Sequence, residues 1–187
     1  IIESLNISSS TGVDFIDTQT VKLVKDEIVG ALTTIINLSI KTSSFPEIYK
    51  HSKIIPLGKK PTLNDLDCAS YRPVNLLPIP GKIVEKAIFN QLAQYLETNR
   101  LIHPNHHGGR KGHSTTTALV QMYNTWVEKM EEGKLVGVLM IDQSATFDLC
   151  YHLILVEKLD LLGVQQNSAC WMESYLTGRS QSTLVDG

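Results

Sequence analysis

The stretch Leu-Val-Gly-Val-Leu-Met-Ile-Asp at residues 135–142 decides how the rest of the sequence is interpreted. Residues 135–141 carry no charge, and such a run is typical of a buried β-strand. The run ends at Asp142, so its carboxylate is expected at a sheet edge, where it could bind a hard cation such as Mg²⁺. The plainer alternative is a surface aspartate that caps the next turn. Asp148 is either a supporting carboxylate or a turn residue.

Outward from this stretch, apolar residues recur at helical spacing. The spacing predicts helices over residues 18–41, 83–96, 115–132, 153–162 and 169–176. Ser114 or Thr115 is expected to cap the third of these helices, and Gly178 to close the last one. Further extended segments are predicted at residues 52–57, 71–77 and 182–185. The alternation of helices and strands predicts an α/β (α+β) fold.

The composition is that of a folded chain. Of its 187 residues, 42% are hydrophobic and 19% are charged, which excludes a disordered tail. The length suits one domain or the front part of a larger one. Because the sequence begins at Ile1 rather than at a methionine, we expect it to be a piece of a longer protein.

Charge is unevenly distributed along the chain. The net charge of −2 excludes a histone-like polycation. Residues 50–111 nevertheless carry +6, whereas residues 1–49 carry −3 and residues 112–187 carry −5. A basic middle segment is consistent either with an ordinary solvated face or with a surface that meets phosphates beside a carboxylate-rich region.

Several basic residues of this middle segment lie where a phosphate could approach. Lys59 and Lys60 follow the predicted strand 52–57, and Arg72 follows the next loop. Arg110 and Lys111 lie among glycines, which let backbone N–H groups approach a phosphate closely, while arginine can donate two parallel hydrogen bonds. The glycine-rich loop does not match the P-loop pattern, so by itself it is a weak indication of phosphate binding.

The histidines and cysteines offer a different hypothesis. His103, His106, His107 and His113 fit neither H-E-x-x-H nor a zinc-finger spacing, and exposed loop histidines explain them better than a zinc site. The three cysteines, at positions 68, 150 and 170, include no C-x-x-C pair and are typical of free thiols in a reducing compartment. We find no signal peptide and no run that could span a bilayer. An α/β metal hydrolase that uses Asp142 and the histidines stays open as an alternative.

Several motifs, in the same order, resemble the fingers of reverse transcriptases from non-LTR retrotransposons. They are Phe45-Pro46-x-x-x-Lys50, Ile54-Ile55-Pro56-Leu57-x-Lys59-Lys60, Ser70-Tyr71-Arg72-Pro73-Val74-Asn75-Leu76-Leu77, Lys82-Ile83-x-Glu85-Lys86 and Gly109-Arg110-Lys111-Gly112-His113-Ser114-Thr115. Two further motifs, Leu139-Met140-Ile141-Asp142-x-x-x-x-Phe147-Asp148 and Ser174-Tyr175-Leu176-x-x-Arg179-x-Gln181, are similar to the first palm motif of that family and the element that follows it. The resemblance covers nearly the whole chain and is weakest over residues 1–44.

The resemblance implies a partial right-hand polymerase. An N-terminal helical extension would occupy residues 1–49, a fingers-like region residues 50–134, and the start of the palm residues 135–187. Asp142 would be the first catalytic, metal-binding aspartate. Phe147 would stand beside the sugar and exclude a 2′-hydroxyl, although a core aromatic is the ordinary interpretation of such a residue. The residues that would face the incoming triphosphate or the template are Lys59, Lys60, Arg72, Arg110 and Lys111.

The implied activity is RNA-directed DNA polymerisation. A primer 3′-hydroxyl would attack the α-phosphate of a dNTP, and pyrophosphate would leave. The implied cofactor is Mg²⁺, with Mn²⁺ as a substitute, and the implied partners are an RNA template, a DNA primer or target, and dNTPs. The lifestyle of the family implies a location in the nucleus and cytoplasm.

The chain also departs from the family pattern. His106 and Gly109 stand where the family usually has Gln and Phe, and Ala145-Thr146 stands where it usually has Lys-Ala. The sequence contains no Phe/Tyr-Ala-Asp-Asp hairpin, which carries the second palm carboxylates of the family. One carboxylate cannot hold two metal ions, so we expect this chain by itself to be inactive. The alternative function is a catalytically inactive, nucleic-acid-binding relic of the same domain.

Overall fold

The computed structural model of the chain describes residues 1–7, 10–59, 66–143, 146–147 and 149–184. The chain divides into two compact units. Unit 1 consists of residues 1–92 and 151–187, and unit 2 consists of residues 93–150. Helices and a small mixed sheet confirm the predicted α/β (α+β) class.

Two consecutive helices open unit 1, where the apolar spacing predicts one helix over residues 18–41. They are α1 (Thr18–Leu23), capped by the side chain of Asp17, and α2 (Lys25–Lys41). Val24 separates them because its backbone lies outside the helical region, at φ −100° and ψ 19°. The predicted helix is therefore confirmed, with one break.

Three further helices are also confirmed, with small differences at their ends. They are α3 (Ile79–Thr98), α5 (His152–Leu161) and α6 (Gln166–Leu176). The helix α3 begins in unit 1 and ends in unit 2, whereas α5 and α6 belong to unit 1. Beyond α6, Gly178 adopts φ +66°, a conformation that glycine reaches without strain, and the chain turns there as predicted.

Unit 1 also contains a β-hairpin. β1 (His51–Gly58) pairs antiparallel with β2 (Tyr71–Leu76), which confirms both predicted extended segments. Pro56 lies opposite Pro73 in this pairing. Pro73 fits because β2 is an edge strand. Pro56 fits because the neighbour of β1 on its other side reaches only as far as Ile54. Neither proline therefore removes a hydrogen bond from a central ladder.

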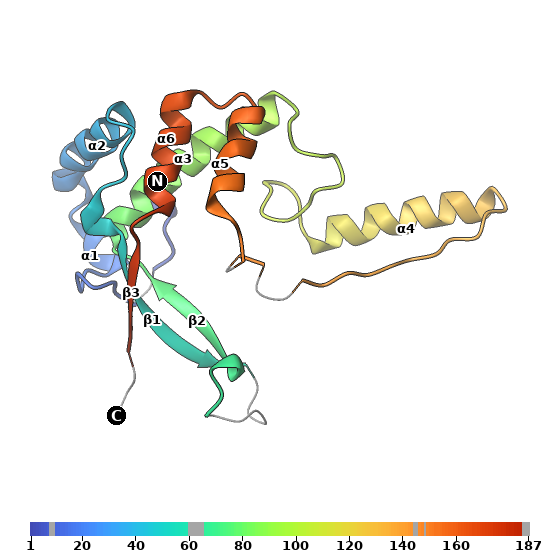
Figure 1. Cartoon of the computed structure of the whole chain (residues 1–187), viewed down its shortest axis with the longest axis horizontal. Coiled ribbons are helices and arrows are strands. Elements are labelled where there is room, and N and C mark those ends of the chain that lie inside the picture. Colours follow the sequence, from blue (N-terminus) through green and yellow to red (C-terminus); the bar gives the residue numbers. More distant parts are fainter. Residues whose placement is uncertain (8–9, 60–65, 144–145, 148, 185–187) are drawn as a thin grey trace. The chain divides into compact units, whose positions relative to one another are not determined.

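A third strand completes a sheet with the order β2-β1-β3 (Figure 1). β3 (Ser180–Thr183) pairs parallel with the first half of β1, from His51 opposite Ser180 to Ile54 opposite Thr183. The sequence predicts a strand two residues later, at 182–185, and says nothing of its partner. Residues 185–187 lie outside the described part of the chain.

Two apolar clusters form the core of unit 1. The buried residues of the first cluster come from α1, α2 and α3, and they are Val21, Leu32, Ile79 and Ile83. The second cluster joins α3 and α6 to the segment after α2 through the buried residues Phe45, Val84 and Trp171. The hydrophobic effect therefore ties helices from both ends of the sequence into one unit.

Phe45 lies at the centre of the second cluster and is completely buried. Its ring centre lies 5.6 Å from that of Trp171 and 5.1 Å from that of Tyr175, both in edge-to-face geometry. The indole Nε1–H of Trp171 donates to Ser39 Oγ at 2.8 Å, and that hydroxyl donates to the Ser44 carbonyl at 2.6 Å. These contacts fix α6 against the end of α2.

The principal element of unit 2 is α4 (Thr115–Glu131), which confirms the predicted helix. Ser114 caps it. The Ser114 hydroxyl accepts from the Thr117 N–H at 3.2 Å, and the Thr117 hydroxyl accepts from the Ser114 N–H at 2.8 Å. No residue of α4 is buried.

The predicted strand over residues 135–141 is wrong for this structure. These residues run as irregular chain, and Leu139, Met140 and Ile141 are 84%, 76% and 77% exposed. A strand persists when a neighbouring chain pairs with its N–H and C=O groups. No described residue pairs with this segment, so its backbone groups have no neighbouring strand with which to form a ladder.

Two predictions about the surface concern cysteines and membranes. Cys68, Cys150 and Cys170 are exposed free thiols. None of the helices in the described part of the chain is long and apolar enough to cross a membrane.

The aromatic cluster predicts where unit 1 is most sensitive to mutation. Phe45→Ala removes a completely buried ring and leaves a cavity, so we expect the free energy of unfolding to fall by about 3–5 kcal/mol. Phe15→Ala is the matched control in the same unit because that side chain is 79% exposed. Its cost should stay below about 1 kcal/mol. Urea denaturation followed by circular dichroism measures both, and equal losses would contradict the assigned core.

Candidate nucleic-acid interface

The β1–β2 hairpin presents basic side chains. Alternation along the strand places Lys53 and Leu57 on the same face of β1, and the register places Arg72 directly opposite Leu57. Lys59 follows β1, and its N–H donates to the Ser70 carbonyl at 2.8 Å, so the pairing continues past the strand ends. The side chains of Lys59 and Arg72 are exposed. We refer to Lys53, Lys59 and Arg72 as the basic hairpin.

An exposed aromatic ring accompanies the basic hairpin. The Lys53 ammonium lies 5.9 Å from the centre of the Phe15 ring, and Phe15 is 79% exposed. Cations neutralise phosphates, and exposed rings stack on bases, so the two together suit a nucleic-acid strand. Lys60, which the sequence also indicates, lies outside the described residues.

Arg110 is held by Glu97 within unit 2. Its Nε and Nη2 donate to Oε1 and Oε2 of Glu97 at 2.6 and 2.8 Å, a bidentate pair. Its Nη1 reaches the carbonyl oxygens of His103 and His106 at 3.5 and 3.4 Å. The side-chain hydrogen bond lowers the pKa of Glu97 and raises the pKa of Arg110. Arg110 thus anchors its loop to the end of α3, and its predicted phosphate contact stays a prediction.

His107 organises the same loop from the other side. Its Nδ1 lies 2.9 Å from Thr117 Oγ1 and its Nε2 lies 2.8 Å from Gln121 Oε1, both on α4. The ring of His113 packs edge-on against it, with the ring centres 5.1 Å apart. Within the described ranges, no three His, Cys, Asp or Glu side chains gather as a metal site requires. The zinc-hydrolase hypothesis therefore gains no support from these residues.

The remaining candidates of unit 2 lie on exposed chain. Asp142 and Lys111 are exposed, and Asp142 lies in the irregular segment rather than at the end of a strand. Phe147 is 95% exposed, so its interpretation as a core aromatic is wrong. Asp148 lies outside the described residues.

The candidates fall into two groups. Lys59 and Arg72 belong to unit 1, where the hairpin brings them to the same end of the sheet. The candidates that belong to unit 2 are Arg110, Lys111, Asp142 and Phe147. The hairpin brings Lys59 and Arg72 together, whereas Asp142 and Phe147 lie on exposed chain.

The residues present meet only part of what a two-metal centre requires. Such a centre holds ions roughly 4 Å apart and needs several carboxylates around them. Asp142 can supply one hard oxygen donor of the kind that Mg²⁺ prefers. It belongs to no cluster of three or more potential ligands in the part of the chain that the structure describes. These residues by themselves therefore do not form the metal centre that the family resemblance implies.

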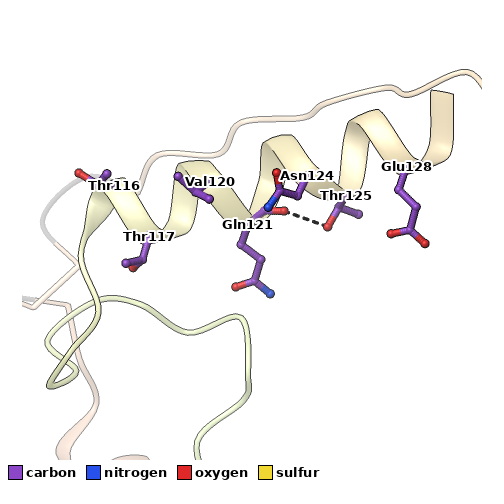
Figure 2. A pocket seen from close by; sticks show the side chains of 7 residues that line it. All are labelled: Thr116, Thr117, Val120, Gln121, Asn124, Thr125 and Glu128. Atoms are coloured by element: carbon purple, nitrogen blue, oxygen red, sulfur yellow. Dashed lines mark hydrogen bonds between the residues drawn. The ribbon is translucent and has the colours of Figure 1, made fainter. Parts of the chain in front are cut away.

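A groove of about 420 Å³ follows one side of α4 (Figure 2). Its lining residues are Thr116, Thr117, Val120, Gln121, Asn124, Thr125 and Glu128. The Thr125 hydroxyl is engaged within the helix, since it donates to the Gln121 carbonyl at 3.0 Å. None of the candidate residues lines this groove, so it adds nothing to the interface.

Sequence reasoning missed the partners of the basic side chains. Glu97 carries no motif signal, and only the fold places it beside Arg110. Arg179 stands in a family-like motif, but its role was not evident from the pattern. In the structure its Cζ lies 4.7 Å from the centre of the Tyr175 ring, and its Nη2 lies 3.8 Å from Glu85 Oε1.

Comparisons with known proteins agree with these motifs. Residues 57–186 match the family described as Reverse transcriptase (RNA-dependent DNA polymerase). The whole chain is 31% identical to the RNA-directed DNA polymerase from mobile element jockey of Drosophila melanogaster, and 30% identical to that of Drosophila funebris. Over 86% of its length it is 27% identical to the probable RNA-directed DNA polymerase from transposon BS of Drosophila melanogaster. The chain spans 20%, 20% and 18% of these relatives, about a fifth of their length.

The Glu97–Arg110 pair predicts a loop whose order depends on pH. Glu97→Gln weakens the pair, so we expect faster amide hydrogen exchange over residues 103–113. In the wild type, the lowered pKa of Glu97 lies below the ordinary value of 4.5. Stabilisation by the pair is therefore fully present above that ordinary value and is lost as the pH falls through the lowered pKa. The NMR chemical shift of the Arg110 Nε–H should move toward that of a free arginine over the same pH range.

Glu131→Gln is the matched control for this test. Glu131 is an exposed residue of α4, and its substitution makes the same change of charge. We expect the control to exchange like the wild type over residues 103–113. If Glu97→Gln also exchanged like the wild type there, the pair would not order the loop.

Proposed function

The chain belongs to the reverse transcriptase family, and we propose that it is a segment of the RNA-directed DNA polymerase of a non-LTR retrotransposon. The observation that carries the proposal is the family match over residues 57–186. It is joined by a similarity of 30–31% identity to the jockey polymerases, which extends over the whole chain. Because the chain spans about a fifth of these relatives, the activity and partners of a complete polymerase are part of the proposal.

In this proposal the basic hairpin contacts phosphates of the RNA template, the DNA primer or the incoming dNTP. Exposed Lys59 and Arg72 support this role, since arginine can hold a phosphate through two hydrogen bonds and lysine supplies a point charge. Lys60 is proposed for the same contact. Arg110 and Lys111 are proposed to act likewise from unit 2, and for Arg110 the phosphate competes with Glu97.

The reaction of the complete polymerase forms a bond between the primer 3′-oxygen and the dNTP α-phosphate, while the bond to pyrophosphate breaks. Mg²⁺ or Mn²⁺ would neutralise the phosphate charge in such a transfer. Asp142 is proposed as the catalytic aspartate and as one ligand of that metal, with the other ligands outside the described residues. Phe147 is proposed to stand beside the sugar and to exclude a 2′-hydroxyl.

The functional division of the chain is part of the same proposal. It consists of a helical extension at residues 1–49, a fingers-like region at residues 50–134 and the start of the palm at residues 135–187. A location in the nucleus and cytoplasm follows from the lifestyle of the family rather than from a feature of the chain.

A catalytically inactive, nucleic-acid-binding relic of the domain is the second candidate. The observation that favours it is the exposed, irregular setting of Asp142, which joins no cluster of potential ligands in the described part of the chain. The departures from the family pattern at His106 and Gly109 point the same way. Metal-dependent primer extension by the purified chain would exclude the relic, and RNA binding without extension would support it.

Arg72→Ala tests the proposed nucleic-acid contact. Loss of one phosphate contact should weaken binding of an RNA template annealed to a DNA primer by about tenfold. It should also reduce the slope of log affinity against log salt by about 0.7 to 0.9. Arg72 is exposed on an edge strand, so the fold should persist. Fluorescence anisotropy of a labelled primer across a salt series measures both quantities.

Lys41→Ala is the control for this experiment. It removes an exposed positive charge from the end of α2, away from the hairpin in sequence and in an acidic part of the chain. Affinity and salt slope should match the wild type. A flat salt response of the wild type, or equal losses in both variants, would contradict the proposed contact.

A further inference from the structure

A polar pocket of about 340 Å³ lies in unit 1, where the sheet meets the end of α6. Its lining residues are Ser52, Asn75, Leu77, Tyr175, Arg179, Ser180 and Gln181. Asn75 and Arg179-x-Gln181 belong to two motifs for which the proposed function supplies no role. The chain brings them together because β3 follows directly after α6 and pairs with β1 (Figure 1).

The guanidinium of Arg179 is held in place by aromatic and polar neighbours. Its Nη1 donates to the Tyr175 carbonyl at 3.0 Å, and its Cζ lies 4.7 Å from the centre of the Tyr175 ring and 5.6 Å from that of Phe45. The side chain still exposes 26% of its surface. A cation that is already positioned loses little freedom when it binds an anion.

The side chains that line the pocket carry a positive charge. Arg179 is its one cation among the described lining residues, and no acidic side chain is among them. Glu85 lies outside the lining, with its Oε1 3.8 Å from Arg179 Nη2. That oxygen is buried and accepts no hydrogen bond from the described residues. Burial raises the pKa of Glu85, whereas the Tyr175 hydroxyl and the Arg179 guanidinium act in the opposite direction.

A row of side chains crosses all three strands at the pocket. Ser52 on β1 donates from its hydroxyl to Asn75 Oδ1 on β2 at 3.1 Å, and Gln181 on β3 lies opposite Ser52 in the register. The bond from Ser52 occupies the acceptor end of the Asn75 amide and directs its NH₂ group to donate elsewhere. The amide of Gln181 provides further donors at the edge of the sheet.

We propose that this pocket binds a phosphate group, with Arg179, Asn75 and Gln181 as its hydrogen-bond donors. One guanidinium, two amides and no lining carboxylate match the several oxygens and negative charge of phosphate. The phosphate comes either from a bound nucleic-acid strand or from a free molecule such as pyrophosphate. The idea that a nucleic-acid strand supplies the phosphate rests on the proposed function. The idea that a free anion supplies it does not.

Titration with inorganic pyrophosphate tests the pocket directly. In the ¹⁵N-labelled chain, the Arg179 Nε–H and Asn75 side-chain NH₂ signals should shift and saturate. Asn75→Asp preserves the shape of the side chain and the acceptor for Ser52, but it places a negative charge in the pocket. We expect this variant to bind pyrophosphate at least about tenfold more weakly. Gln181→Glu, at an exposed position of β3, should have the same effect and serves if Asn75→Asp does not fold.

Asn37→Asp is the matched control, because it makes the same charge change at an exposed position of α2. It should bind pyrophosphate like the wild type. The absence of a saturable shift in the wild type would overturn the pocket. Equal affinity of the wild type and the two pocket variants would also overturn it.

The source of the phosphate is settled by repeating the comparison with labelled template–primer. Weaker binding of the nucleic acid by Asn75→Asp would assign the pocket to a strand. Weaker binding of pyrophosphate alone would assign it to a free anion. If the wild type bound pyrophosphate but no nucleic acid, the proposed function would fail while the pocket stood.

Discussion

The packing of Phe45 against α6 is the contact on which the rest of unit 1 depends. The backbone N–H of Phe45 donates to Ser174 Oγ at 3.0 Å, while Trp171 donates to Ser39 at 2.8 Å. These bonds lie at the edge of a buried aromatic cluster, so breaking one of them would leave a polar group without a partner and cost free energy. They join parts of the chain that are far apart in sequence and fix where α6 ends. Because β3 follows α6, they also determine that β3 can pair with β1.

The central strand β1 then separates two surfaces with different chemistry. Alternation sends Lys53 to one face of the sheet together with Arg72, and it sends Ser52 to the opposite face together with Asn75. The first face carries the half-buried Lys53 and the exposed Arg72, which suit the phosphates of a nucleic-acid strand. The second face lines a pocket whose donors surround Arg179. Both surfaces depend on the same three-stranded sheet. The hairpin and the segment around Arg179, which both carry motifs of the family, are therefore parts of one structural element.

Local patterns predicted the elements whose stability is local. The helix 115–132 was predictable because Ser114 caps it and its apolar spacing is regular, and the strands of the hairpin were predictable from residues before proline and from short apolar runs. Pairings between distant segments could not be predicted from local patterns. The parallel β1–β3 ladder and the Glu97–Arg110 pair have no signature in nearby sequence, and the apolar run 135–141 looks like a strand but finds no pairing partner among the described residues. Candidate site residues could be named from motifs, but their neighbours required the fold.

Photocrosslinking tests most directly the claim that this chain holds nucleic acid through the basic hairpin. An RNA template containing 4-thiouridine would be annealed to a DNA primer, irradiated with the purified chain, and the crosslinked peptides identified by mass spectrometry. We expect adducts on the peptides that contain Lys59 and Arg72, with yields that fall as salt rises. Adducts confined to the acidic residues 1–49, or yields that do not respond to salt, would contradict it.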